Sequence, residues 1–208
     1  MKPMNNRSTV LVDIDDTLSD TQVAMLRYVN SKSAQPYRFE ELTRAHREEA
    51  VPEYERLVQE FLADPQLVGQ CRPYRTALAA MQQLHDAGYA IHIVSSRREP
   101  LHAVTTAWLK EHGFADYVSA IHPRSARHTG KEFKRLVAER IKPAAAFDDT
   151  LEVAEILAGT GVLVYLIHQP WNAGESLPEN IHRAETFAAA ATDFLNRQRA
   201  AGTPTPPS

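Results

Sequence analysis

The fold is decided by the stretch DIDDTLSD, Asp13–Asp20, which directly follows the short apolar run Val10–Val12. A short apolar run bounded by polar residues is typical of a strand that is covered on both faces. Asp13 and Asp15 are two residues apart, so on a strand they project to the same side. Burying carboxylates costs free energy unless a cation or hydrogen-bond donors compensate. Two clustered carboxylates and Thr17 at the end of a buried strand therefore indicate a magnesium site suited to phosphate chemistry.

Four more apolar runs follow and alternate with amphipathic segments. The five predicted strands are Thr9–Ile14, Ala90–Val94, Tyr117–Ile121, Ala144–Phe147 and Val162–Ile167. Between them, apolar residues recur at helical spacing, and a glycine follows several of these stripes as a helix cap does. This alternation predicts an α/β fold, a three-layer doubly wound parallel sheet with helices on both faces. Such sheets bind ligands outside the carboxyl ends of their strands.

The segment from Thr21 to Arg72 breaks this alternation, because it shows helical patterning and no strand signal. Its clearest helix has Pro52 in the first turn and ends at Asp64-Pro65, with the spacing i, i+3, i+4, i+7, i+8 kept by Tyr54, Leu57, Val58, Phe61 and Leu62. A plain crossover would be much shorter. We therefore expect a small all-helical cap, residues 21–72, inserted after the first strand into a core domain of residues 1–20 and 73–199. Residues 200–208 have nothing to bury and are predicted to form a disordered tail.

The composition indicates which partners to expect. The 208 residues carry a formal net charge of −3, so there is no overall basic footprint and nucleic acid is an improbable partner. The single cysteine, Cys71, cannot form an intrachain disulfide, which favours a reducing compartment. The first residues lack the apolar stretch of a signal peptide, and no run is long enough to cross a membrane. We expect a cytoplasmic protein, whose oligomeric state the sequence leaves open.

Polar groups follow several of the predicted strands at the same end. These groups are Asp13 with Asp15, Ser95-Ser96-Arg97, Lys131 at the start of a helix, and Asp148-Asp149. Each alone is weak evidence, because strands often end in acidic residues, Ser-Ser-Arg is more often a turn, and a lone lysine more often faces solvent. Carboxyl ends of parallel strands share one edge, however, so the four groups together favour a site.

Phosphoryl transfer needs these residue types. The reaction requires an in-line nucleophile and cations around the nonbridging oxygens. Asp13 can attack to give an aspartyl-phosphate, while Asp15 protonates the leaving oxygen and later activates water. Asp13 and Asp149 supply the oxygen ligands that Mg²⁺ prefers. A lysine offsets the negative charge, and serine hydroxyls with free helix amides hold the phosphate.

On these motifs the chain resembles the haloacid dehalogenase superfamily of phosphatases, over roughly Thr9 to Asn172. The matching motifs are Asp13-x-Asp15-x-Thr17, Ser95 after an apolar strand, Lys131, and Asp148-Asp149. The resemblance implies a five-stranded parallel core, Asp13 as nucleophile, and Asp15 as general acid/base whose backbone carbonyl also binds the metal. It implies phosphate binding by Ser95 and Lys131, and Ser96 and Thr17 are further candidates for this role. Asp149 would be a direct Mg²⁺ ligand, with Asp148 nearby or acting through water.

Two details refine the resemblance. The metal-free dehalogenase branch lacks the second aspartate, so Asp15 points to the phosphatase and phosphomutase branch. Ser95-Ser96-Arg97, Asp148-Asp149 and the ending HQPWN, His168–Asn172, look like the deoxyribonucleotidase group, which acts on nucleoside monophosphates. Arg97 and Trp171 are then candidate substrate-binding residues. Tyr28, Phe39 or Tyr54 of the cap are candidates for stacking on a base, although a core or surface role is commoner for aromatic residues.

The sequence thus predicts a Mg²⁺-dependent phosphomonoester hydrolase that acts on a small phosphorylated metabolite, with nucleoside 5′-monophosphates as the leading substrates. A polynucleotide 3′-phosphatase, a sugar-phosphate phosphatase and a phosphomutase remain alternatives. A phosphate-binding or scaffold protein without turnover is the alternative from another class. Concentrated carboxylates speak against the last, since they cost free energy and binding alone does not need them.

Overall fold

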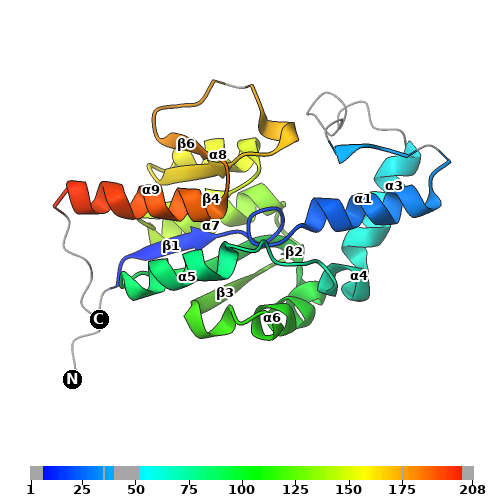
Figure 1. Ribbon diagram of the computed structural model, residues 1–208, viewed down its shortest axis with the longest axis horizontal. Helices are drawn as coiled ribbons and strands as arrows, with labels where there is room; N and C mark the ends of the chain where they lie inside the picture. The colour runs from blue at the N-terminus through cyan, green and yellow to red at the C-terminus, as the bar shows by residue number, and fades with distance from the viewer. Residues whose placement is uncertain (1–6, 35, 40–51, 175, 203–208) are drawn as a thin grey trace.

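A parallel sheet forms the centre of the molecule in the computed structural model, which describes residues 7–34, 36–39, 52–174 and 176–202 (Figure 1). Its six strands in the described residues are β1 Thr9–Val12, β2 Ala90–Arg98, β3 Val118–Arg124, β4 Ala145–Asp148, β5 Leu163–Ile167 and β6 Ile181–Ala184. They lie in the order β3-β2-β1-β4-β5-β6, and every neighbouring pair is parallel. The predicted doubly wound α/β fold is confirmed, and β1 lies at the point where the strand order reverses.

Helices cover both faces of the sheet. One face packs against α5 Ala77–Asp86, α6 His102–Glu111 and α9 Phe187–Ala200, and the other against α7 Gly130–Ile141 and α8 Leu151–Ala158. Successive residues of β1 divide between the two cores, because strand side chains alternate in direction. Val10 and Val12 belong to the first core, and Leu11 belongs to the second. Burial on both faces explains why the central strands have continuous apolar sequences.

The sheet has one strand more than the five predicted. β6 is an edge strand, and Ile181 is its one buried residue. Because the other positions are half-buried, the strand needs no apolar run, and its sequence Ile-His-Arg-Ala shows none. Short 3₁₀ turns complete the described connections, at η2 Glu99–Leu101, η3 Ala115–Tyr117 and η4 Pro170–Asn172. None of the described helices combines the length and the apolar character that a membrane crossing requires.

Three helices of the described residues lie within the segment predicted to be a cap. They are α1 Thr21–Lys32, α3 Pro52–Ala63 and α4 Pro65–Gly69, and Figure 1 shows them together at the right of the view, on the side of the molecule opposite the last turn of α9. Their buried side chains form a separate apolar cluster with Leu101 and Trp171. The break at Asp64-Pro65 has a local cause, since the Asp64 carboxylate accepts the backbone N–H groups of Gln66 and Leu67 and caps α4. Residues 35 and 40–51 of the predicted cap lie outside the described residues.

The C-terminal helix reaches the predicted tail. Ala200 is the last residue of α9, and residues 203–208 of the expected disordered tail lie outside the described residues. The buried positions of α9 keep helical spacing, at Phe187, Ala190, Ala191, Phe194 and Leu195. The same spacing is readable in the sequence, although no helix was predicted beyond residue 172.

Candidate active site

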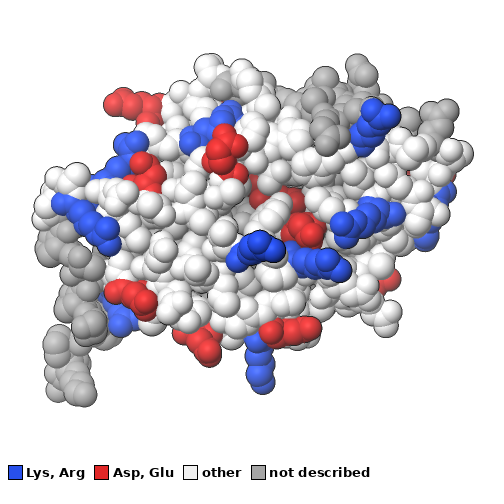
Figure 2. All heavy atoms as spheres, viewed as in Figure 1, with Lys and Arg blue, Asp and Glu red and all other residues white. Residues whose placement is uncertain are grey.

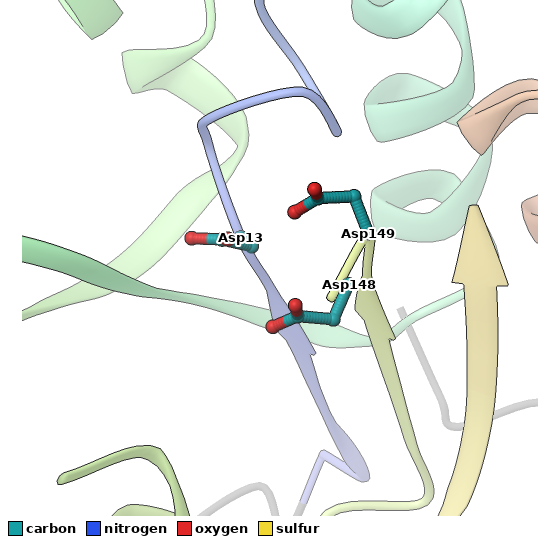
Figure 3. A group of neighbouring side chains, drawn as sticks. All are labelled: Asp13, Asp148 and Asp149. Carbon is teal, nitrogen blue, oxygen red and sulfur yellow. The ribbon is translucent and has the colours of Figure 1, made fainter. Parts of the chain in front are cut away.

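Three buried carboxylates meet where β1 and β4 end (Figure 3). The backbone N–H of Asp13 donates to Phe147 at 3.0 Å, which extends the β1–β4 pairing to the first residue of the acidic stretch. Asp148 and Asp149 follow Phe147 directly. One carboxylate oxygen from each of the three aspartates lies within 4.8 Å of the others. The pairing of two parallel strands thus brings together residues that are more than a hundred positions apart in the sequence.

Lys134 of α7 lies between two of these carboxylates. Its Nζ is 2.7 Å from an oxygen of Asp13 and 2.7 Å from an oxygen of Asp148, and its side chain is 3% exposed. Burial alone would lower the pKa of Lys134, but the attraction of the two carboxylates outweighs it and raises that pKa. Lys134 is therefore a fixed positive charge at the centre of the acidic cluster.

The predicted lysine, Lys131, is not the one beside Asp13. Lys131 lies in the first turn of α7 with an exposed side chain, and Lys134 occupies the expected position three residues later. The buried face of α7 consists of Phe133, Lys134, Val137 and Ala138. A lysine that falls within an apolar stripe is the signal that identifies Lys134, because a charged residue on a buried face must have partners.

The two carboxylate oxygens of Asp13 have different surroundings. Oδ2 contacts Lys134, whereas Oδ1 is buried and has no hydrogen-bond donor among the described residues. Burial raises the pKa of Asp13 well above its ordinary value, and the negative charges of Asp148, Asp15 and Asp149 add to this rise despite the opposing effect of Lys134. A buried carboxylate oxygen without a donor, beside two other carboxylates, fits a hard divalent cation that prefers oxygen ligands.

Asp15 is held by Arg97 from the end of β2. The Arg97 Nε lies 3.0 Å from Oδ2 and its second terminal nitrogen 2.7 Å from Oδ1, so the contact is bidentate. The Thr21 hydroxyl also donates to Oδ1, at 2.7 Å. Burial raises the pKa of Asp15, but the charge and hydrogen bonds of Arg97, with that hydroxyl, outweigh it and leave the pKa below the ordinary value. Arg97, expected as a substrate ligand, is thus the partner of Asp15.

The turn after β1 brings a fifth aspartate close to the others. Asp16 has a φ of 54°, in the left-handed region that favours glycine or a residue whose polar side chain bonds locally. Its carboxylate accepts the backbone N–H of Gln22 at 2.8 Å and so anchors the start of α1. Burial and the charge of Asp149 raise its pKa well above the ordinary value. Asp16 is not among the site residues predicted from the sequence.

The predicted phosphate-binding hydroxyls occupy different environments. Ser96 is exposed toward the site, whereas Ser95 is buried and its hydroxyl accepts the N–H of Arg97 at 3.1 Å. Thr17 is fully buried, and its hydroxyl has no hydrogen-bond partner among the described residues. Gly130, the first residue of α7, lies so close to Ser96 that a Cβ there would be 2.3 Å from the Ser96 Oγ. Glycine therefore lets the N-terminus of α7 reach the end of β2.

A turn after β5 contacts the acidic cluster from the other side. The Trp171 indole N–H donates to Asp149 Oδ2 at 2.9 Å, and the Asn172 amide donates to the Asp149 carbonyl at 2.7 Å. The Gln169 amide donates to the Asp16 carbonyl at 3.0 Å. Trp171 was predicted to bind substrate, and this stays a prediction; in the structure its N–H is directed at a carboxylate of the site. The sequence analysis missed the roles of Gln169 and Asn172, because nothing local signals contacts to residues so far along the chain.

A cavity of about 380 Å³ opens over these groups. Its polar residues include Asp13, Asp15, Asp149, Ser96 and Arg97. Its apolar wall comes from the helical segment and the neighbouring turns, with Met25, Val58, Leu62, Val68, Leu101 and Trp171. A larger hollow of about 550 Å³ lies between α5 and α9 and contains none of the site residues. The smaller cavity therefore combines the reactive groups with space for a ligand.

The cap aromatics do not line the described part of this cavity. Tyr54 packs against Tyr37 with ring centroids 4.9 Å apart, and Tyr28 packs against Phe61 at 5.8 Å. Phe39 meets the ring of Trp171 edge-on at 6.1 Å. In the described residues these three side chains thus pack within the helical cluster, which is the commoner role for an aromatic residue.

Comparisons with known proteins give a family and solved structures that share the fold. Residues 7–128 match the model of the family described as 5′ nucleotidase, deoxy (pyrimidine), cytosolic type C protein. No curated protein matches the sequence.

Solved structures share the fold at low sequence identity. A haloacid dehalogenase-like hydrolase from Streptococcus pneumoniae is 13% identical with a TM-score of 0.59, covering 92% of this chain and 98% of its own. A haloacid dehalogenase phosphatase from Thermococcus onnurineus is 14% identical with a TM-score of 0.58, covering 95% and 99%. CbbY from Rhodobacter sphaeroides, solved with phosphate, is 15% identical with a TM-score of 0.58, covering 90% and 99%.

Proposed function

The chain belongs to the 5′ nucleotidase, deoxy (pyrimidine), cytosolic type C family of haloacid dehalogenase phosphatases, and on that premise we propose that it hydrolyses nucleoside 5′-monophosphates with Mg²⁺. The observation that carries this proposal is the meeting of the Asp13, Asp148 and Asp149 carboxylates, together with an Asp13 oxygen that has no hydrogen-bond donor among the described residues. Lys134 offsets part of their charge. A cation held by these carboxylates, together with Lys134, would attract the negative charge of a phosphate ester.

The metal would be held by Asp13 and Asp149, with Asp148 nearby and the backbone carbonyl of Asp15 as a further oxygen. Asp148 already receives Lys134 on one oxygen and the N–H of Thr150 on the other, at 3.0 Å, which supports an indirect role for it. When bound, Mg²⁺ would supply positive charge next to the phosphoryl oxygens. The ligand set of carboxylate and carbonyl oxygens supports Mg²⁺ rather than a softer metal.

Asp13 is the proposed nucleophile. Lys134 fixes its Oδ2, so Oδ1 is the oxygen that attacks phosphorus as the bond to the leaving oxygen breaks. Asp15 gives a proton to the leaving oxygen and later takes one from the water that cleaves the aspartyl-phosphate. Without substrate, Arg97 favours the ionised form of Asp15. A substrate phosphate beside Arg97 competes for the guanidinium, which raises the pKa of Asp15 toward the form that donates.

Ser96 and the N-terminus of α7 are the proposed phosphate contacts, with the Ser95 and Thr17 hydroxyls as further candidates. Ser96 lines the cavity, and Gly130 brings the N-terminus of α7 against it. We further propose that residues 21–72 act as a cap over the core of residues 1–20 and 73–199, since α1, α3 and α4 supply most of the apolar cavity wall. That wall would receive the nucleoside.

The cavity favours a small metabolite over a polynucleotide end. Its residues come from the core and from the helical segment together, so a ligand there is covered on one side. Figure 2 shows acidic side chains in the hollow at the centre of the face with basic side chains beside them, and the formal net charge of the whole chain is −3, so there is no overall basic footprint. We place the protein in a reducing compartment such as the cytoplasm. In support, the single cysteine, Cys71, is a free thiol.

The test is phosphate release from a panel of deoxynucleoside monophosphates, sugar phosphates and 3′-phosphorylated oligonucleotides. We expect Mg²⁺-dependent hydrolysis that EDTA abolishes and that is fastest with nucleoside 5′-monophosphates. Asp13→Asn should lower kcat by about 10³-fold or more with the thermal transition retained. Asp86→Asn, an exposed carboxylate on α5, is the control and should keep full activity. Undiminished turnover by Asp13→Asn would show that another residue attacks phosphorus.

A further inference from the structure

We propose that Trp171 is a positioning residue that fixes the carboxylate of Asp149 at the cation site, an inference that rests on the proposed function. The indole Nε1 lies 2.9 Å from Asp149 Oδ2, and both side chains are buried, at 6% exposure each. An indole N–H donates a hydrogen bond and has no lone pair for a metal ion. The contact therefore orients the Asp149 carboxylate, and Trp171 cannot serve as a metal ligand in its place. Hydrogen bonds to an ionised acceptor are stronger than neutral ones, above all where water is excluded.

The neighbouring residue holds the main chain of the same aspartate. The Asn172 amide donates to the Asp149 carbonyl at 2.7 Å and to the Ile167 carbonyl at 2.7 Å, which ties the end of β4 to the end of β5. The Asn172 oxygen in turn accepts the N–H of Gln169 at 3.2 Å. Consecutive residues of η4 thus hold the side chain and the backbone of Asp149. This leaves the carboxylate little freedom to turn away from Asp13.

Trp171 is itself held by the helical segment. It belongs to the apolar cluster of α1, α3 and α4, and its ring meets Phe39 edge-on at 6.1 Å. The indole is therefore packed on one side and bonded to Asp149 on the other. It follows that the helical segment contributes to the cation site through Trp171 without supplying a ligand. Residues that orient metal ligands in this way commonly affect metal affinity by about 10- to 100-fold.

This role differs from the substrate binding that the sequence predicts for Trp171. A residue that only stacks on a base changes the KM for nucleotides and leaves Mg²⁺ affinity unaffected in the absence of substrate. A positioning residue changes Mg²⁺ affinity before any substrate is added. The two roles are therefore separated by metal binding alone, measured by calorimetry on the full chain.

The chain provides a matched control, because it has two tryptophans. Trp108 is also buried, and its indole N–H donates to the Cys71 carbonyl at 2.7 Å, with no contact to a site carboxylate. We expect Trp171→Phe to weaken Mg²⁺ binding about 10-fold or more. Trp108→Phe loses a comparable hydrogen bond and should stay within about twofold of the wild type.

The same two variants allow a second measurement. In Trp108→Phe the only tryptophan is Trp171, so its fluorescence should change as Mg²⁺ is added. In Trp171→Phe the only tryptophan is Trp108, and its fluorescence should not change. If Trp171→Phe does not fold, the titration of Trp108→Phe still tests the proposal. A Trp171 fluorescence that does not respond to Mg²⁺ overturns it.

The failure of this inference is distinguishable from that of the proposed function. Asp149→Asn should abolish Mg²⁺ binding. If the wild type binds no Mg²⁺, or Asp149→Asn binds it normally, the cation site is wrong and the role of Trp171 is wrong with it. If Asp149→Asn loses binding while Trp171→Phe keeps wild-type affinity, the cation site stands and the positioning role alone is overturned.

Discussion

At the scale of single residues, Lys134 shows how a buried charge is tolerated. Its ammonium group contacts Asp13 and Asp148 at 2.7 Å each, inside a region where an unpaired ion would cost several kcal/mol. Lys134 in turn stabilises the two carboxylates, because they lie within 4.8 Å of each other and of Asp149 and their negative charges repel. Lys134 is therefore part of the stability of the site as well as of its proposed chemistry.

Replacing Lys134 by methionine tests this dependence. We expect Lys134→Met to lower the free energy of unfolding by about 3–5 kcal/mol at neutral pH, because buried carboxylates lose their partner. The pKa of Lys134 is higher in the folded protein than in the unfolded chain. Its contribution to the free energy of unfolding is therefore complete at pH values below the pKa of the unfolded chain, and it is lost only as the pH rises through the pKa of the folded protein. Urea denaturation at pH 7 gives the measurement, and activity should fall with it.

The matched control for that substitution is Lys131→Met, on the same helix three residues earlier. Lys131 is exposed, so this change should alter stability by no more than about 0.5 kcal/mol and keep activity. The reverse result, with Lys131→Met inactive and Lys134→Met unaffected, would show that the lysine beside Asp13 is wrongly identified.

At the scale of elements, the placement of α7 depends on its contact with the end of β2. The helix starts with a capping box, in which Thr129 and Glu132 satisfy each other's backbone N–H groups. Gly130 then passes directly against Ser96. This contact sets the distance of Lys134, one turn later, from the sheet. The capping residues are readable from the sequence, but the need for glycine is not, because Ser96 lies on another element.

Gly130→Ala is expected to destabilise the protein by about 1–3 kcal/mol, because the new Cβ would lie 2.8 Å from the Cβ of Ser96 and overpack the contact. In an uncrowded helix the same change is favourable by up to about 1 kcal/mol. Gly159→Ala at the end of α8 is the comparison, since its φ of −61° suits alanine and its nearest neighbours are 3.4 Å away. That variant should stay within about 0.5 kcal/mol of the wild type in urea denaturation. Equal stabilities for the two variants would contradict the close approach of α7.

At the scale of the whole molecule, stability should depend on pH through a histidine pair that links three elements. His92 of β2 and His122 of β3 are 3.1 Å apart, and Arg140 of α7 lies 3.3 Å from the other nitrogen of His122. Burial and the positive charge of Arg140 lower the pKa of His92, and burial, His92 and Arg140 lower the pKa of His122. Both rings are part-exposed, so solvent weakens these effects.

The sign of the pH dependence follows from these shifts. Because the folded pKa values lie below the unfolded value of 6.5, the unfolded chain binds more protons as pH falls through this range. The free energy of unfolding should therefore fall as pH drops from 7 to 5, and part of that fall should disappear in the double variant His92→Gln, His122→Gln. Urea denaturation at each pH measures both slopes, with His102→Gln, an exposed position, as control. Identical slopes in wild type and double variant would contradict the role of the pair.

The sequence by itself determined the alternation of strands and helices and the acidic groups at the ends of β1 and β4. Periodicity and composition act within a few neighbouring residues, so these features are encoded locally. Only the tertiary structure decided that Lys134 rather than Lys131 lies beside Asp13, that Arg97 pairs with Asp15, and that Trp171 bonds to Asp149. Asp15 and Arg97 are 82 residues apart, and Asp149 and Trp171 are 22 apart. Such pairs depend on which strands become neighbours and on how a helix face is turned, and those are settled by packing of the whole chain.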